Sequence, residues 1–386
     1  MEHFARRSRP SLSRRPGYSG HGAAPPPPRK RGRHCFHWHH LAHFPARMAG
    51  PWILRASRAQ PASMLRLAHT KGVSMKIAVM GAGGMGGWLG AKLAAAGSDV
   101  TFLARGAHLE AIRASGLRVT GAESLRLGDA VATDRPDEIG PVDVVLFCVK
   151  LYDTESAAKA LAPLLGPETF VVTVQNGVES TDRIGKVIGD GRTLAGAAYF
   201  PANIAAPGEV AYLGRIEGKP HIAFGEPGAG SSKRACAFAE ICRAAAIDAE
   251  VFEDTDLMIW EKFCLIAGTS ASTALTRQTV GVVRNDPDMR WFLSEAIAEA
   301  ARVGRRLGVA LADDTETRIL DFIDHNPPNG KSSQLVDLER GRRLELDGLS
   351  GAVVRLGKQA GVPTPVHATV YAALKPFVDG APGAQR

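Results

Sequence analysis

Short apolar runs recur along the chain from residue 77 onward, and longer segments of mixed polarity separate them. The runs are Ile77–Met80, Val100–Leu103, Val142–Val149 (interrupted only by Asp143) and Phe170–Val174. Runs of this length that are apolar on both faces are typical of strands in a parallel sheet, because helices cover both faces of such a sheet. The pattern therefore predicts alternating strands and helices around a buried parallel sheet.

The turn after the first predicted strand is rich in glycine. It reads Gly81-Ala82-Gly83-Gly84-Met85-Gly86 and precedes an Ala- and Leu-rich helical segment, Trp88–Ala96. In a strand–turn–helix–strand unit, Gly81 makes the tight turn, Gly83 lets the backbone approach a pyrophosphate, and Gly86 lets the helix pack on the strand. The helix start, with its free N–H groups, favours the negative diphosphate. A glycine turn that serves packing alone is the alternative.

The end of the second predicted strand indicates which dinucleotide binds. NAD sites usually place an acidic residue there for the ribose 2′-hydroxyl, whereas NADP sites use a nearby arginine for the 2′-phosphate. Here the strand ends Leu103-Ala104-Arg105-Gly106, with no carboxylate. Because a phosphate prefers the planar guanidinium, we predict NADP binding with Arg105 at the phosphate. An exposed surface arginine is the alternative.

The pattern changes in the second half of the chain. Residues 195–226 are predicted to form a β-ribbon that turns at Pro207-Gly208, and helical periodicity begins near Thr255. The predicted helices are Ile259–Thr276, Met289–Leu307, Ser332–Arg340 and Gly348–Ala360. The fold class is therefore α/β, with a Rossmann-type parallel-sheet domain over residues 75–250 that binds NADP. An all-α domain over residues 251–386 is expected to carry substrate and catalytic groups.

Three polar residues are candidates for the cleft between these domains. Lys150 and Asn176 each follow a predicted strand, at the sheet edge where open α/β sheets bind ligands. Both residue types also end strands without any further role. Lys262 has apolar neighbours, so partial desolvation lowers its pKa and eases proton donation. A lysine that extends to solvent, or that pairs with Glu261, is the alternative.

The formal net charge of +8 comes from the first 74 residues, which carry 14 Lys or Arg and the single acid Glu2. The remainder is acidic, so nothing in it suggests nucleic-acid binding. Residues 1–74 could be a transit peptide, a metal-binding segment around His34–His40, or upstream codons of a chain that begins at Met75. We favour the last and expect a disordered or mis-started extension without a metal site.

Cysteine usage and hydropathy bear on the compartment. The five cysteines form no Cys-x-x-Cys pair, and no apolar stretch approaches the roughly 20 residues that span a bilayer. We expect a cytoplasmic protein that does not bind membranes. A homodimer is possible, although no heptad repeat requires one.

Together these motifs resemble the ketopantoate reductase (2-dehydropantoate 2-reductase) family over nearly all of residues 75–380. The residues that carry the resemblance are Gly81–Gly86, Val149-Lys150, Gln175-Asn176-Gly177, Trp260-Glu261-Lys262, Lys331-Ser332-Ser333, Asp337, Glu339-x-Gly341-Arg342, Glu345-x-Asp347 and Gly361-Val362-Pro363-Thr364-Pro365. The resemblance implies a Rossmann domain joined to a helical domain, NADPH as hydride donor and reduction of a small 2-keto acid. The reaction would be reduction of 2-dehydropantoate to pantoate in pantothenate biosynthesis.

The resemblance also implies roles by position. Lys262 would be the general acid and contact substrate, and Glu345 would orient a substrate hydroxyl or the cofactor. Asn176 would bind near nicotinamide and substrate, and Ser333 would hold the substrate carboxylate. The cofactor would further contact the glycine turn, Arg105, Lys150 and, through its backbone, Ala202.

Four positions depart from the family pattern, which often has asparagine there. They are Ile266, Ser270, Val280 and Ser350, and of these Ser270 is kept as a substrate-binding candidate. A site that loses hydrogen-bond donors discriminates less well for a hydroxyl group. Three alternatives therefore stay open: an NADPH-dependent reductase of a different, more apolar 2-keto acid, a non-catalytic NADP-binding protein, and a related dehydrogenase that acts on an imine.

Overall fold

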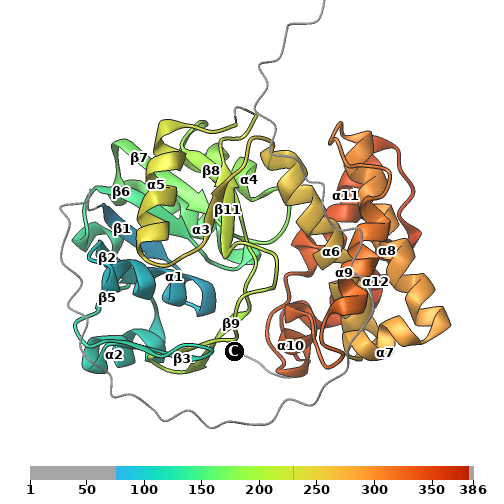
Figure 1. Ribbon diagram of the computed structural model, residues 1–386, viewed down its shortest axis with the longest axis horizontal. Helices are drawn as coiled ribbons and strands as arrows, with labels where there is room; N and C mark the ends of the chain where they lie inside the picture. Colours follow the sequence, from blue (N-terminus) through green and yellow to red (C-terminus); the bar gives the residue numbers. More distant parts are fainter. Residues whose placement is uncertain (1–74, 229, 382–386) are drawn as a thin grey trace, which may run out of the picture. The chain divides into compact units, whose positions relative to one another are not determined.

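The computed structural model describes residues 75–228 and 230–381, and the prediction for residues 1–74 lies outside them. Within this part of the chain, eight strands form one sheet in the order β12-β11-β8-β7-β6-β1-β2-β5 (Figure 1). Their bounds are β1 Lys76–Met80, β2 Asp99–Leu103, β5 Val131–Thr133, β6 Val142–Phe147, β7 Leu165–Thr173, β8 Thr193–Ala198, β11 Ile222–Gly225 and β12 Ala249–Val251. Within this eight-stranded sheet only the β8–β11 pairing is antiparallel, which confirms the predicted parallel sheet.

Helices cover both faces of this sheet. They are α1 Gly84–Ala95, α2 Gly106–Ser115, α3 Thr154–Lys159, α4 Ser180–Ile188 and α5 Lys233–Ala244. In β1, Ile77 and Val79 join the apolar core formed with α1, α2 and α5, whereas Ala78 and Met80 join the core formed with α3 and α4. Successive strand residues point to opposite faces, so this burial explains why the run is apolar throughout.

Several predicted ends of elements are wrong, and two of them lie in the sheet region. The helix that we expected from Trp88 begins at Gly84, because it starts inside the glycine turn with Gly83 as its N-cap. The strand that we expected to reach Val149 ends at Phe147. Its last pairing is with Thr173 of β7.

The predicted β-ribbon over residues 195–226 is correct only at its centre. β9, Ala202–Ala206, and β10, Glu209–Tyr212, form the antiparallel hairpin at Pro207-Gly208. They belong to a second sheet, with β3 Leu117–Gly121 and β4 Leu125–Leu127. The flanking strands β8 and β11 enter the large sheet instead, because their residues are buried throughout whereas most of β9 is exposed.

From Thr255 onward the described chain is helical. The helices, gold to red in Figure 1, are α6 Thr255–Thr276, α7 Val280–Asn285, α8 Pro287–Arg306, α9 Thr315–His325, α10 Ser333–Glu339, α11 Ser350–Ala360 and α12 Pro365–Leu374. They enclose apolar cores of their own, so the all-α prediction is confirmed. α6 begins four residues earlier than predicted, because the Asp254 side chain accepts the Leu257 N–H at 2.9 Å and caps the helix.

The division after residue 250 stays a prediction. In the described residues, no helix combines the length and the apolar character that crossing a membrane requires.

Candidate active site

The glycine turn leaves open backbone at the start of α1. Gly81 has φ of +97°, where a side chain is strained, and a Cβ on Gly86 would lie 2.2 Å from the Gly81 carbonyl oxygen. At Gly83, no heavy atom of the described chain beyond the adjoining residues lies within 4 Å of the Cβ position. The first turn of α1 carries no acidic residue. This cradle fits the diphosphate of a dinucleotide.

The second sheet forms a wall beside this turn. A Cβ on Gly84 would lie 2.3 Å from the carbonyl oxygen of Ala202, the first residue of β9. The backbone of Ala202 therefore lies against the predicted cofactor turn, and its contact with the cofactor stays a prediction. Ala82 is buried and Met85 is half-buried in the same turn.

Arg105 lies near this turn on the exposed surface. It is the N-cap of α2, two residues after β2 ends at Leu103. The Leu103 carbonyl accepts the Gly81 and Ala82 N–H groups at 3.2 and 3.1 Å, which holds the end of β2 against the turn. Arg105 is exposed, and its contact with a 2′-phosphate stays a prediction.

Lys150 lies among carboxylates that the helical region supplies. Its Nζ is 2.9 Å from Asp337 Oδ2 and 3.2 Å from Glu345 Oε2. Desolvation alone would lower the pKa of Lys150, but Glu345 and Asp337 outweigh it and raise that pKa well above its usual value. Glu345 also accepts the buried Leu151 N–H at 2.9 Å. The structure therefore brings together two residues that were predicted separately, Lys150 and Glu345.

Lys262 and Asn176 line one small cavity at the carboxyl end of β7. Gly196, Phe263 and Ile266 also line it. Lys262 keeps some accessible surface as a residue, but its ammonium is deeply enclosed. Desolvation lowers its pKa to about 8, against the opposing charge of Glu345. The ammonium is therefore poised to lose a proton near neutral pH.

The remaining predicted positions are more dispersed. Ser270 is buried on α6, two turns after Lys262. Ser333 is exposed at the start of α10, next to Ser332, whose hydroxyl lies 2.7 Å from Thr273 Oγ1. Of the four departures, Ile266 alone is placed beside Lys262 in the cavity.

Val280 and Ser350 pack against other residues of the helical region. Val280 begins α7 and packs at the edge of the helical core. Ser350 is fully buried, and its hydroxyl lies 3.2 Å from Nδ1 of His367. These contacts explain a small or apolar residue at both positions without any substrate.

Three residues at the site had no predicted role. Asp337 pairs with Lys150, and Gln175 donates to the Val149 carbonyl at 2.9 Å, which joins the ends of β6 and β7. The Tyr199 ring centre lies 5.6 Å from Lys262 Nζ, and burial raises the pKa of its hydroxyl. Asp337 and Gln175 stand in the motifs quoted above, and Tyr199 follows β8, so strand ends and charged motifs were the available signals.

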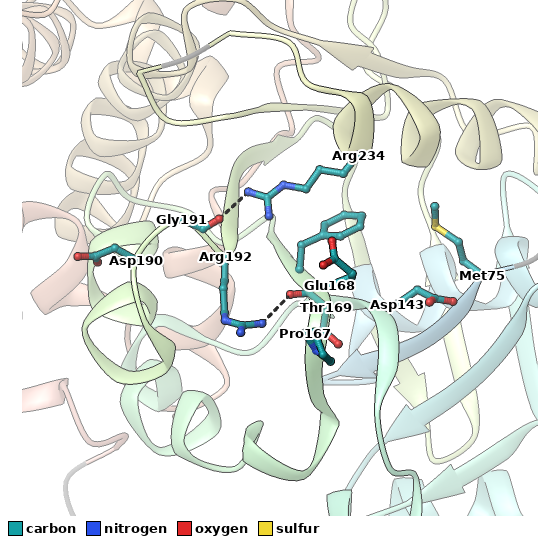
Figure 2. Close-up of a pocket in the computed structure, with 10 residues that line it drawn as sticks. Met75, Asp143, Pro167, Glu168, Thr169, Asp190, Gly191, Arg192 and Arg234 are labelled. Atoms are coloured by element: carbon teal, nitrogen blue, oxygen red, sulfur yellow. Dashed lines mark hydrogen bonds between the residues drawn. The ribbon is translucent and has the colours of Figure 1, made fainter.

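A larger cavity, of about 570 Å³, lies elsewhere in the sheet region (Figure 2). Its lining residues include Met75, Asp143, Arg192 and Arg234. Met75 precedes β1, Asp143 is at the start of β6, and Arg192 precedes β8, so this cavity is at the amino ends of the strands. Ligands in such sheets bind at the carboxyl ends. The smaller cavity is therefore our candidate for the active site.

The fold and this arrangement define a class of protein. A parallel sheet whose first turn is built for a diphosphate, with an enclosed lysine at the carboxyl edge, is the framework of a nicotinamide-dinucleotide oxidoreductase with a helical second region.

Comparison with known proteins narrows this class. Residues 77–227 match the family model "Ketopantoate reductase PanE/ApbA", and residues 254–378 match its C-terminal model. A 2-dehydropantoate 2-reductase of Mesorhizobium japonicum is 34% identical, over 78% of this chain and 97% of that protein. One of Archaeoglobus fulgidus is also 34% identical, over 76% and 95%.

Solved structures agree with these matches. A PanE/ApbA family ketopantoate reductase from Ralstonia eutropha superposes with a TM-score of 0.71 at 32% identity, covering 79% of this chain and 98% of that one. A 2-dehydropantoate 2-reductase from Geobacter metallireducens gives 0.73 at 28% identity, covering 78% and 99%. A D-mandelate dehydrogenase with NADH and anilino(oxo)acetate, at 20% identity and 0.71, shares the fold.

This chain belongs to the ketopantoate reductase family. It is an oxidoreductase of the type that acts on a CH–OH group, and its cofactor is NADPH.

Proposed function

We propose that this chain reduces 2-dehydropantoate to pantoate with NADPH, a step of pantothenate biosynthesis. The observation that carries the proposal is the shared cavity of Lys262 and Asn176 at the carboxyl edge of the sheet, in a chain of the ketopantoate reductase family. NADPH, when bound, supplies the hydride that reduces the substrate carbonyl carbon.

The residues of this chain hold the cofactor and manage the proton. The glycine turn offers backbone N–H groups to the diphosphate, and Arg105 offers its guanidinium to the 2′-phosphate. Lys150 and Asn176 each lie three residues beyond the end of a strand, at the carboxyl edge of the sheet. We assign them to cofactor contact, and Asn176 to substrate contact as well.

Lys262 gives its proton to the carbonyl oxygen as negative charge develops there. Its ammonium also stabilises that charge before transfer, and the enclosed setting strengthens the interaction. The negative charge of Glu345 raises the pKa of Lys262 against the effect of desolvation, so a larger fraction of Lys262 stays protonated at neutral pH. Ser270 and Ser333 are our candidates for further substrate contacts.

A second candidate is reduction of a different 2-keto acid, one with an apolar side chain. Ile266 favours it, because an isoleucine lines the cavity where the family often has asparagine. An apolar wall gives no hydrogen bond to a substrate hydroxyl, so selectivity for hydroxylated keto acids would be weak. A non-catalytic NADP-binding protein has less support, because an enclosed lysine with a lowered pKa suits proton transfer.

NADPH oxidation at 340 nm with 2-dehydropantoate and a panel of 2-keto acids separates these candidates. Preference for 2-dehydropantoate supports the first, and preference for an apolar keto acid supports the second. Activity that requires an added amine would indicate imine reduction. Binding of NADPH without oxidation by any substrate would contradict all three enzymatic functions. Ile266→Asn should raise kcat/KM for 2-dehydropantoate, with Val280→Asn as the matched control at a position outside the cavity.

Assembly and compartment are proposals too. A homodimer is supported by the fold shared with a dimeric ketopantoate reductase from Staphylococcus aureus, at 17% identity and a TM-score of 0.66. Light scattering of the purified protein tests it. A cytoplasmic location follows from the proposed pathway and is tested by cell fractionation.

A further inference from the structure

His108 joins three segments around the cofactor turn. It lies in the first turn of α2 and is half-buried. Its Nδ1 accepts the Gly208 N–H at 3.0 Å, and its Nε2 lies 2.8 Å from the Ala82 carbonyl oxygen. Because Nδ1 accepts, the proton of the neutral ring is on Nε2, which donates to Ala82. Burial lowers the pKa of His108, which favours this neutral form.

The bond to Ala82 sets the direction of a cofactor-facing amide. In a planar trans peptide, the Ala82 carbonyl and the Gly83 N–H point in opposite directions. The Gly81 and Ala82 N–H groups are already used by the Leu103 carbonyl. Among the described residues no acceptor is found for the Gly83 N–H, and His108 is the one partner of the Ala82 carbonyl. Holding that carbonyl against α2 therefore turns the Gly83 N–H toward the open side of the turn.

The bond to Gly208 extends this support to the hairpin. Gly208 lies in the turn between β9 and β10, with φ of +74°, and a Cβ there would lie 3.1 Å from Ala111 of α2. β9 begins at Ala202, whose carbonyl packs against Gly84 of the cofactor turn. One imidazole thus connects α2, the glycine turn and the hairpin wall.

We propose that His108 is a positioning residue that holds the Ala82–Gly83 peptide in the orientation that binds the cofactor diphosphate, and so sets the affinity for NADPH. The proposal concerns the cofactor alone. It stands or falls independently of which keto acid the chain reduces.

Three variants separate the two hydrogen bonds. His108→Ala removes both. His108→Asn places an amide oxygen near the Nδ1 position and keeps only the Gly208 bond, whereas His108→Gln reaches the Nε2 position and keeps only the Ala82 bond. His221→Ala is the control, because its imidazole also supports the hairpin strand β10, through Tyr212 Oη at 3.0 Å, but contacts no residue of the glycine turn.

The readouts are the NADPH Kd from cofactor fluorescence, the melting temperature without cofactor, and kcat at saturating NADPH. We expect the Ala and Asn variants to raise Kd about tenfold, with kcat nearly unchanged, since one hydrogen bond contributes about that factor. The Gln variant should restore most of the affinity, and the His221→Ala control should keep it.

Wild-type affinity in the Asn variant, or a Gln variant as weak as the Asn variant, would overturn the proposal. Equal Kd increases in His108→Ala and His221→Ala would also overturn it, because they would show that His108 acts only by supporting the hairpin. If the Ala variant does not fold, the Asn and Gln pair decides the question.

Discussion

If Lys262 supplies the proton, the rate must follow its protonation state. Its pKa of about 8, instead of the ordinary 10.5, places the loss of the acid within the range that an assay can reach. A general acid acts only while it holds its proton, so kcat/KM should be level below this pKa and fall tenfold per pH unit above it. Between pH 7 and pH 9.5 the protonated fraction drops by roughly thirtyfold.

The assay is the initial rate of NADPH oxidation at saturating NADPH and limiting keto acid, from pH 6.5 to pH 10. Under these conditions kcat/KM reports the enzyme before substrate binds. Two variants identify the residue. Lys262→Arg carries a charge that does not titrate in this range, so any residual activity should lose the alkaline decline. Glu345→Gln removes a charge that raises the pKa of Lys262, so the decline should move to lower pH.

Glu339→Gln is the matched control, because Glu339 forms an exposed ion pair with Lys331 and does not act on Lys262. Its profile should match the wild type. A profile that stays flat to pH 10, or an unchanged decline in Lys262→Arg, would refute the assignment of Lys262 as the acid.

Two further predictions follow from the same geometry. Gly86→Ala should greatly reduce both NADPH binding and the melting temperature, because its Cβ would lie 2.2 Å from a carbonyl oxygen. Gly83→Ala should weaken NADPH binding with little change in melting temperature, because the space around its Cβ position is open. Similar melting temperatures for the two variants would contradict this reasoning. Lys262→Met should abolish turnover yet raise the free energy of unfolding by roughly 1–2 kcal/mol at pH 7, after allowance for the exposed part of the side chain. In the wild type, burial of the charged Lys262 ammonium destabilises the folded state fully below the folded pKa of about 8, and this effect disappears as pH rises toward 10.5. Urea denaturation should therefore show that the stability advantage of Lys262→Met shrinks between these two pH values.

The glycine turn shows how far a local pattern reaches. Gly81 and Gly86 were assigned their roles from spacing alone, and the positive φ of one and the close packing of the other agree with that. Lys262 was selected because its neighbours in sequence are apolar, and Phe263 and Ile266 of α6 do line its cavity, together with residues of the sheet region. Helix starts were less accurate, since a cap such as Asp254 depends on side-chain geometry.

Sequence spacing could not show that Lys150 contacts two carboxylates, because Asp337 and Glu345 follow it by 187 and 195 positions. The same holds for Ser350, which looked like a lost substrate contact and instead pairs with His367. Residues 195–226 alternate and turn like a ribbon, but pairing with β7 and β3 divides them between two sheets.

The sequence by itself determined the class of fold, the cofactor turn and the candidate acid, because each depends on residues close together in the chain. The tertiary structure decided which polar groups meet, which departures face the cavity, and that His108 supports the cofactor turn. Those properties depend on strand partners and helix packing, through which buried polar groups find their hydrogen-bond partners across long stretches of chain.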